Sequence, residues 1–233
     1  MNVSQSNENE TMLATRRSVL LLIAALGLGY AAPRPTAAAD DGFIAMFNGQ
    51  DFSGWVVEGA KTSGKGDEAK PIWSVENGSI VASGKGYGFV RYDVKVSDFV
   101  FEVEYRLSKK ANSGVGIRTV PYTGAVATRP SFAAYEIQIL DDAGKPANEH
   151  SSGSLYRYVA AKANATLPTG QWNKMHIECR GPKIFIMLNG KTIQDLDQTT
   201  IEKIKDKPLS GYLCLQSHSN RVEFRNPRFK KLE

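Results

Sequence analysis

Residues 135–141, Y-E-I-Q-I-L-D, constrain the fold of this chain more than any other stretch. Three apolar residues alternate with Glu136, Gln138 and a leucine, and a period of two places the two sets on opposite faces of a β-strand. A carboxylate and a carboxamide are costly to bury in a dry core. One face of this strand is therefore expected to pack in the core, while the other lies in a wet groove or on a solvated outer surface.

Short alternating segments of the same kind recur along the chain, including residues 98–107, 115–120 and 211–218. Asn-Gly pairs and Gly-rich turns separate them, and only residues 201–207 have a helix-like pattern. Such a series of strands predicts an all-β fold of two packed sheets, a jelly-roll β-sandwich whose curved sheet forms a concave groove. The groove face of these strands is predicted to hold Arg118, Glu136, Gln138, Gln216 and His218.

The segment 1–39 has the features of an export signal rather than of a folded domain. Arg16 and Arg17 precede the apolar run 19–32, which is shorter than the roughly 20 residues that a membrane-spanning helix needs, and an A-x-A pattern closes the segment. These features predict a cleaved twin-arginine signal peptide, with no stable membrane span left after cleavage. Residues 40–233 then form one exported domain, periplasmic or secreted, in a bacterium. The alternative is an uncleaved N-terminal anchor.

The charge and cysteine content exclude several classes of protein. The formal net charge of +5 is small and the charged residues are interspersed, so the sequence does not indicate nucleic-acid binding. Cys179 and Cys214 are too few for a disulfide scaffold. The strand phases place Cys179 in the core and Cys214 on the groove face, which favours two separate thiols, although an oxidising compartment would permit one disulfide. No C-x-x-C or Cys/His cluster indicates a metal site.

An ordered series of short motifs resembles the 3-keto-disaccharide hydrolase family. The motifs are, in chain order, M-F-N-G-Q-D-F-S-G-W (46–55), W-S-V-E-N-G-S-I (73–80), N-S-G-V-G-I-R (112–118), Y-E-I-Q-I-L-D (135–141), G-S-L-Y (153–156), Q-W-N-K (171–174), L-N-G (188–190) and L-Q-S-H…V-E-F-R-N-P-R (215–228). They cover nearly all of residues 40–233. Their order is more specific than any one of them alone.

The resemblance implies a concanavalin A-like, glucanase-like jelly roll. It also implies cleavage of carbohydrates, such as oxidised disaccharides or glucosides, whose sugar has first been converted to a ketone at carbon 3 by a separate dehydrogenase. No cofactor is implied for the cleavage itself. One departure from the family pattern is Cys214, where relatives often have a glycine.

A ketone at carbon 3 determines which groups the cleavage needs. The ketone acidifies the hydrogen on carbon 2, so a base can remove it while the bond to the anomeric oxygen breaks, and water then adds to the enone. This chemistry needs a base, a donor to the enolate oxygen and an acid for the leaving group. We expect Glu136 to be the base, because a partly dry groove raises the pKa of a carboxyl, with His218 as an alternative base or acid. The other expected contacts are Arg118 and Gln138 to the ketone or enolate, Gln216 and Tyr156 to hydroxyls, and His150 in the groove lining.

Two other functions are compatible with the same residues. A retaining β-glucanase would use Glu136 as nucleophile and Asp141 as acid, about 5 Å apart, although the E-x-D-x-x-E pattern of such enzymes is only partly present. A non-catalytic carbohydrate-binding module would instead stack exposed aromatic side chains on sugar rings. A divalent metal also stays open, because Glu136, Asp141 and His218 are possible ligands without a recognisable spacing.

Overall fold

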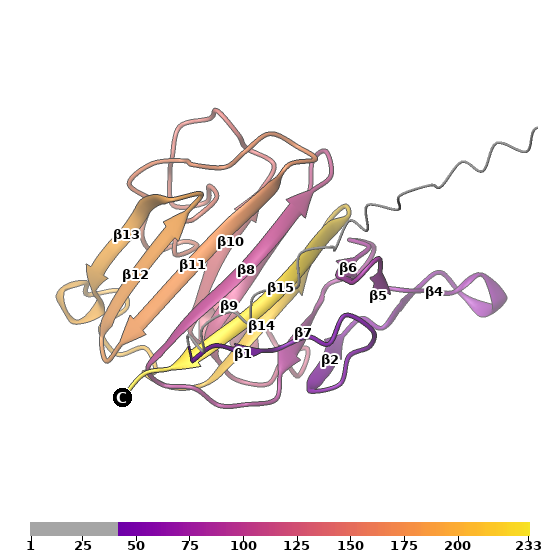
Figure 1. Ribbon diagram of the computed structural model, residues 1–233, viewed down its shortest axis with the longest axis horizontal. Helices are drawn as coiled ribbons and strands as arrows, with labels where there is room; N and C mark the ends of the chain where they lie inside the picture. The colour runs from indigo at the N-terminus through magenta and orange to yellow at the C-terminus, as the bar shows by residue number, and fades with distance from the viewer. Residues whose placement is uncertain (1–41) are drawn as a thin grey trace, which may run out of the picture. The chain divides into compact units, whose positions relative to one another are not determined.

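The computed structural model describes residues 42–233, in which two β-sheets pack face to face (Figure 1). The predicted twin-arginine motif, apolar run and cleavage site lie outside the described residues. Within 42–233, no helix is long and apolar enough to cross a membrane. The predicted all-β sandwich is confirmed.

The larger sheet has eight strands in the order β13-β12-β11-β8-β15-β6-β5, with β1 paired to β15. Its strands are β1 (Ile44–Ala45), β5 (Trp73–Glu76), β6 (Ser79–Ala82), β8 (Phe99–Leu107), β11 (Trp172–Arg180), β12 (Lys183–Leu188), β13 (Lys191–Asp197) and β15 (Val222–Lys231). Neighbouring strands run antiparallel.

The smaller sheet has five antiparallel strands in the order β10-β9-β14-β7-β2. Its strands are β2 (Trp55–Gly59), β7 (Gly88–Tyr92), β9 (Asn112–Thr119), β10 (Tyr135–Leu140) and β14 (Tyr212–Ser217). The remaining elements are the ribbon β3 (Thr62–Ser63) and β4 (Lys70–Pro71), the 3-10 turns η1 (Gly66–Glu68), η2 (Val126–Thr128) and η3 (Gln198–Thr200), and helix α1 (Pro130–Ala133).

The core lies between the two sheets, and strand β10 shows how the sequence specifies it. Tyr135, Ile137 and Ile139 are fully buried in the core, as their alternation predicts. Glu136 and Gln138 belong to the opposite face of the strand. Burying each large apolar side chain stabilises the fold by about 1.5–3 kcal/mol. A one-residue slip in register would move all three out of the core, so the register is strongly fixed.

Turn residues behave as the sequence predicts, and the helix-like segment 201–207 forms turns rather than a regular helix. Asn77 and Gly78, with φ of 50° and 71°, form the tight turn between β5 and β6. The helix-like pattern at 201–207 forms hydrogen-bonded turns, with the Lys205 amide donating to the Ile201 carbonyl at 3.0 Å. The structure has its short helix α1 at Pro130–Ala133, with proline at its first position.

A β-bulge interrupts strand β9 and changes which residues face the core. Gly116 pairs with Cys214 on β14, but Thr119 pairs with Tyr212, so β9 carries one extra residue between the two pairs. Arg118 lies in this bulge with φ of 54°, in the left-handed region. A bulge of this kind redirects the side chains that follow it.

The bulge turns Arg118 into the interior. Its side chain is fully buried, and its Nε and Nη2 atoms donate to the carbonyl oxygen of Ser97 at 3.2 and 2.9 Å. Asp98 Oδ1 lies 3.5 Å from Nη2. The strand phase predicts Arg118 on the groove face, and the structure places it in the interior because the bulge reverses that phase.

The two cysteines are both buried, free thiols on different sheets, Cys179 on β11 and Cys214 on β14. The prediction of two separate thiols is therefore confirmed over a disulfide. Cys214 packs tightly against strand β9, because a Cβ atom added at Gly116 would overlap its Sγ atom.

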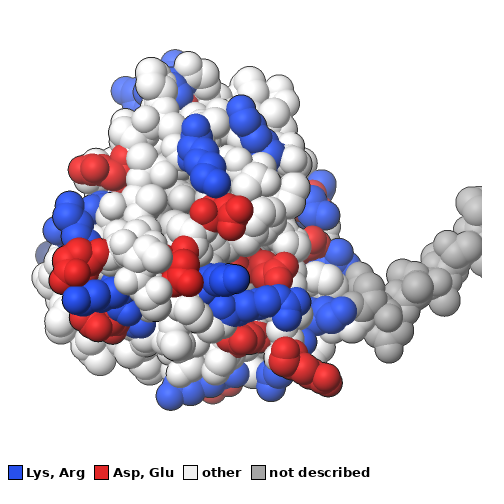
Figure 2. Space-filling model, turned by 90° about the vertical axis from the view of Figure 1, so that its left-hand side faces the viewer, with Lys and Arg blue, Asp and Glu red and all other residues white. Residues whose placement is uncertain are grey.

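The face of the larger sheet that points away from the core carries a ladder of ion pairs. Glu102 on β8 accepts from Arg228 on β15 at 2.7 Å, and Glu104 accepts from Arg225 at 2.6 Å. Elsewhere on the surface, basic and acidic side chains are also interspersed, as Figure 2 shows for one face. This mixture is consistent with the small net charge.

Candidate active site

A cavity of about 230 Å³ opens on the face of the smaller sheet that points away from the core. It brings together six residues that the sequence predicts for the site: Glu136, Gln138, His150, Tyr156, Gln216 and His218. Six further residues line it that the sequence analysis does not identify: Tyr87, Asn112, Arg129, Ser131, Phe132 and Arg157. Arg118 and Asp141 are not part of the lining.

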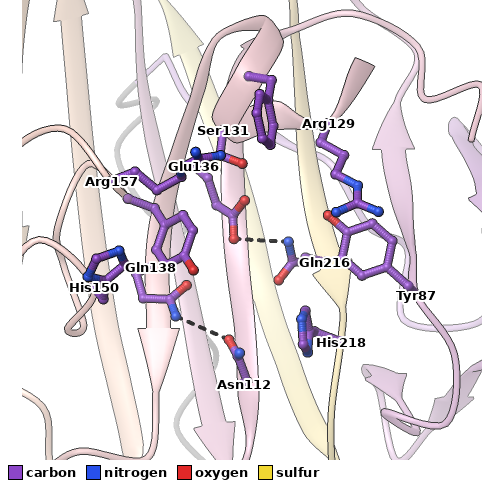
Figure 3. A pocket seen from close by; sticks show the side chains of 12 residues that line it. Tyr87, Asn112, Arg129, Ser131, Glu136, Gln138, His150, Arg157, Gln216 and His218 are labelled. Carbon is purple, nitrogen blue, oxygen red and sulfur yellow. Dashed lines mark hydrogen bonds between the residues drawn. The ribbon is translucent and has the colours of Figure 1, made fainter. Parts of the chain in front are cut away.

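Strand β10 places Glu136 at the centre of the cavity, between two walls (Figure 3). Its side chain is 6% exposed, and its Oε1 atom accepts a hydrogen bond from Gln216 Nε2 on β14 at 3.0 Å. Gly114 on the neighbouring strand makes room for it, because a Cβ there would lie only 2.9 Å from Glu136 Cγ. A glycine at this position therefore allows the carboxyl to lie flat over the sheet.

The environment of Glu136 favours its neutral form. Burial raises the pKa of this carboxyl, and hydrogen bonds from Gln216 and Ser131 oppose the rise, as do the charges of Arg129 and Arg157. A carboxyl whose pKa is raised takes up a proton more readily than an ordinary glutamate does. Such a group is suited to proton transfer near neutral pH.

One wall of the cavity comes from an irregular segment that covers the free edge of β10. The Tyr156 amide donates to the Glu136 carbonyl at 2.9 Å, and the Gly153 amide donates to the Gln138 carbonyl at 2.8 Å. This pairing protects an edge that would otherwise be open to other chains. It also delivers Tyr156 and the next residue, Arg157, to the cavity, while His150 contacts the Tyr156 ring with centroids 5.1 Å apart.

The opposite wall is built from Tyr87, Arg129 and His218 (Figure 3). The Tyr87 ring contacts the His218 ring edge-on at 5.5 Å, and the Arg129 guanidinium lies over the same tyrosine at 4.8 Å. Burial lowers the pKa of His218, and the charge of Arg129 lowers it further. The lowered pKa favours the neutral form of the His218 imidazole.

Three buried side-chain polar atoms of the lining have no hydrogen-bond partner among the described residues. They are the amide oxygens of Gln138 and Gln216 and the Nε atom of Arg129. The amide nitrogens of both glutamines are engaged, that of Gln138 by Asn112 Oδ1 at 3.2 Å. Buried polar atoms are usually paired, so unpaired acceptors and a donor around one carboxylate favour a polar ligand.

Asp141, the predicted acid of a retaining glucanase, lies outside the cavity lining. Its carboxylate accepts from the Thr169 hydroxyl at 2.6 Å and from the Lys110 amide at 2.8 Å, and these hydrogen bonds lower its pKa. The side chain follows the end of β10 and fixes loops there. Spacing in the sequence suggests a pair with Glu136, but the structure does not bring the two carboxylates into one cavity.

The three possible metal ligands, Glu136, Asp141 and His218, do not line one cavity. No group of three or more His, Cys, Asp or Glu side chains within residues 42–233 is arranged to hold a metal ion. Glu136 and His218 line the cavity, and Asp141 does not.

The lining residues that the sequence analysis misses come mostly from loops. Arg129, Ser131 and Phe132 lie around α1, in a Pro/Gly/Thr-rich segment whose composition predicts only a loop. Arg157 has a φ of 74°, a backbone conformation that periodicity cannot indicate. The available signals are their neighbours in the sequence: an Arg-Pro pair just before strand β10, and an arginine directly after the G-S-L-Y motif.

Comparison with known proteins agrees with this architecture. A 3-keto-disaccharide hydrolase of Bacteroides thetaiotaomicron is 27% identical over 83% of this chain and 79% of the relative. A Parabacteroides distasonis protein, provisionally named a glycosyl hydrolase, has the same fold with a TM-score of 0.66, 22% identity, and coverage of 82% of this chain and 94% of that one. The exoplasmic domain of VIP36, in a form bound to Ca²⁺ and Man3GlcNAc, matches with a TM-score of 0.53 at 9% identity, covering 82% and 89%.

The match at the level of the family covers most of the chain. Residues 42–230 match the family described as a 3-keto-alpha-glucoside-1,2-lyase-like domain. The resemblance that the ordered motifs indicate is thereby confirmed, and the chain belongs to this family.

Proposed function

We propose that this protein is a glycosidase-type enzyme that cleaves 3-keto-glycosides, such as 3-keto-disaccharides, by elimination followed by hydration. Family membership and a relative named 3-keto-disaccharide hydrolase support the broader assignment. The observation that supports the specific chemistry is Glu136, a buried carboxyl with a raised pKa in a cavity with unpaired polar atoms.

Glu136 acts as the base in this proposal. Its carboxylate takes the proton from carbon 2 of the keto sugar, and the electrons of that C–H bond form the enolate of the carbon 3 ketone. The enolate then re-forms the ketone as the bond between carbon 1 and the leaving oxygen breaks, which gives an enone. General base catalysis of this kind typically contributes about 10²- to 10⁴-fold in rate.

In this proposal, Arg129 is the cation that stabilises the enolate oxygen. Its Nε atom has no partner in the described part of the chain, and it lies on the wall beside Tyr87. A donor that is already oriented toward developing negative charge needs little reorganisation during the reaction. Arg129 thus replaces Arg118, which the sequence suggests for this part but whose donors point to Ser97.

The glutamines hold the sugar, and His218 serves the second half of the reaction. The free amide oxygens of Gln138 and Gln216 accept hydrogen bonds from hydroxyls of the sugar. The protonated Glu136 gives its proton to the leaving oxygen. The neutral imidazole of His218 then accepts a proton from the water that adds to carbon 1, and this proton replaces the one lost from carbon 2, so that both groups return to their starting state. The two groups divide the proton transfers because burial raises the pKa of one and lowers that of the other.

The proposal includes the setting in which the enzyme acts. Its substrate has to be oxidised at carbon 3 by a separate dehydrogenase, since cleavage itself leaves the oxidation state of the sugar unchanged overall. The N-terminal pattern of residues 1–39 supports export, so the two activities would meet outside the cytoplasm.

No observation favours the predicted alternatives. A binding module that stacks tryptophans on sugar rings is not favoured, because Trp55 and Trp73 are buried and the Trp172 ring, outside the cavity lining, is covered by Arg106 and Arg225. A retaining glucanase lacks its second carboxylate in the cavity.

The test uses a 3-keto-glucoside carrying deuterium at carbon 2, with the unoxidised glucoside as the control. We expect turnover of the ketone only, and a primary isotope effect on kcat/KM because the C2–H bond breaks. Turnover of the unoxidised glucoside at a similar rate would overturn the proposal, and so would hydrolysis of the ketone without any loss of deuterium to solvent. Turnover before and after dialysis against a chelator would decide whether a divalent metal is required.

A further inference from the structure

Phe132 is a large apolar side chain that stays 40% exposed while lining the mouth of the cavity. It belongs to helix α1, which comes just before strand β10, the strand that carries Glu136. Exposed aromatic side chains beside a polar cavity are common contact points for ligands with a flat apolar face. The surroundings of Phe132 decide whether it is an incidental surface residue.

Several contacts hold Phe132 in place. Lys207 Nζ donates to the Phe132 carbonyl at 2.9 Å, and the Tyr158 hydroxyl donates to the adjacent Ser131 carbonyl at 2.8 Å. The Arg157 guanidinium packs on the phenyl ring with its central carbon 4.3 Å from the ring centroid. Three side chains from other segments thus fix the backbone and one side of an exposed ring.

The anchoring lysine is part of a packed cluster rather than of the open surface. Lys207 Nζ lies 4.6 Å from the centroid of the Tyr158 ring and 5.8 Å from that of Tyr135. Burial lowers its pKa to about 8, with a smaller contribution from Arg157. The ammonium therefore remains protonated near neutral pH and keeps its cation–π contacts.

The cavity is too small to enclose both the keto sugar and the leaving group of a substrate. Pockets that enclose drug-sized ligands measure about 300–1,000 Å³, whereas this cavity measures about 230 Å³. It suits a single sugar ring over Glu136. The leaving group of a disaccharide or aryl glucoside then lies at the mouth of the cavity, where Phe132 is exposed.

We propose that Phe132 is the stacking platform for the leaving group and so determines which 3-keto-glycosides are cleaved well. The proposal rests on the function proposed above and names its preferred substrates, those whose leaving group is a ring with a flat apolar face, either a pyranose or an aryl group. Such a ring stacks on the phenyl group while the keto sugar occupies the cavity. A methyl glycoside has no ring to stack on Phe132.

The experiment compares kcat/KM for methyl, phenyl and glucosyl 3-keto-glucosides in the parent and in Phe132→Ala. Taking the ratio of variant to parent for each substrate cancels the intrinsic reactivity of its leaving group. We expect the Phe132→Ala change to lower kcat/KM about tenfold for the phenyl and glucosyl substrates, and to leave the methyl substrate within twofold. The Phe132→Tyr variant should restore both ring-bearing substrates. A loss restricted to one of them would identify that leaving group as the preferred ligand.

Val126→Ala is the matched control, since Val126 is 49% exposed in the same loop and does not line the cavity. It should leave all three substrates unchanged. An equal loss for all three substrates in Phe132→Ala, or no loss for either ring-bearing substrate, would overturn the platform. If the parent cleaves none of the three, the proposed function fails instead. The stacking role of Phe132 is then tested separately, by calorimetric binding of the same ketones to Glu136→Gln with and without Phe132→Ala.

Discussion

Strands β8 and β10 look alike in sequence but differ in their electrostatics. Both alternate core residues with acidic ones, Glu102 and Glu104 on β8 and Glu136 on β10. Burial alone would raise the pKa of Glu102 and Glu104, but hydrogen bonds lower both on balance, from His176 and Arg228 to Glu102 and from neighbours that include Arg225 to Glu104. For Glu136 the effect of burial prevails, and its pKa is raised.

The difference arises from what covers each face. The β8 face is open, and adjacent strand β15 places an arginine beside each carboxylate, which makes a stable ladder. The β10 face is covered by the α1 segment and by residues 153–157, and within residues 42–233 Glu136 is buried with hydrogen bonds but without an ion-pair partner. The partners and the covering segments, rather than the alternation itself, therefore distinguish the ion-paired face of β8 from the cavity-lining face of β10.

The sharpest test of this contrast is a pair of identical substitutions. Glu136→Gln should lower kcat/KM for a 3-keto-glucoside by about 10²- to 10⁴-fold, because it removes the base, and should leave the fold intact. Glu104→Gln should leave kcat/KM unchanged and lower the free energy of unfolding by about 0.5–1 kcal/mol, because it weakens a partly exposed ion pair. Steady-state kinetics and urea unfolding of both variants measure this. A similar loss of activity in both would mean that the two strands do not differ in function.

The two arginines near β9 and α1 give a second matched pair. Arg129→Met should lower kcat/KM by about 10²-fold, because it removes a donor to the enolate oxygen. Arg118→Met should lower the free energy of unfolding by about 1–3 kcal/mol, because the Ser97 carbonyl loses its donors, with kcat little changed. Thermal unfolding and kinetics distinguish them. A loss of kcat in the Arg118→Met variant, at temperatures where this variant is folded, would instead indicate that Arg118 contacts the enolate oxygen.

The smallest expected effect is a difference in how stability depends on pH. The pKa of Glu136 is raised in the folded state, so its contribution to stability is present below the ordinary glutamate pKa and is lost as pH rises through the folded value. The pKa of Glu104 is lowered, so its contribution is present above the ordinary value and is lost as pH falls. Between pH 4 and 7, Glu136→Gln should gain on the parent as pH rises, while Glu104→Gln should fall further behind it.

Urea unfolding at several pH values checks these opposite slopes. Parallel curves for both variants would show that the two carboxylates share one environment. Steady-state kinetics at the same pH values give an activity profile, in which kcat/KM of the parent should rise with pH through the raised pKa of Glu136 because the base must be ionised.

Much of the fold follows from local patterns, since alternation decides the faces of strands such as β8 and β10 and Asn-Gly pairs decide turns such as 77–78. The floor of the site follows from the same rule, which is why Glu136, Gln138 and Gln216 are predicted and found in the cavity lining. The position of Arg118 does not follow, because one extra residue in β9 reverses the phase and no sequence pattern marks it. Asp141 is close to Glu136 in sequence, but it lies just after the end of β10, where its carboxylate accepts hydrogen bonds from Lys110 and Thr169.

The walls are harder to predict than the floor. Arg129, Phe132 and Arg157 come from segments without regular periodicity, and their positions depend on contacts with distant residues such as Lys207. Composition identifies these segments as loops and nothing more. Residues at long sequence separation determine their course, so only tertiary structure reveals them.

The tight packing of Cys214 against Gly116 has a consequence for how this floor can change through evolution or design. A Cβ atom at 116 would overlap Cys214 Sγ and would also lie only 2.8 Å from Thr119 Cγ2, so a larger residue at 116 requires smaller ones at both 214 and 119. Single replacements at 116 should be rejected, whereas a compensated exchange across β9 and β14 should be tolerated. Libraries meant to reshape the floor should therefore vary positions 116, 119 and 214 jointly.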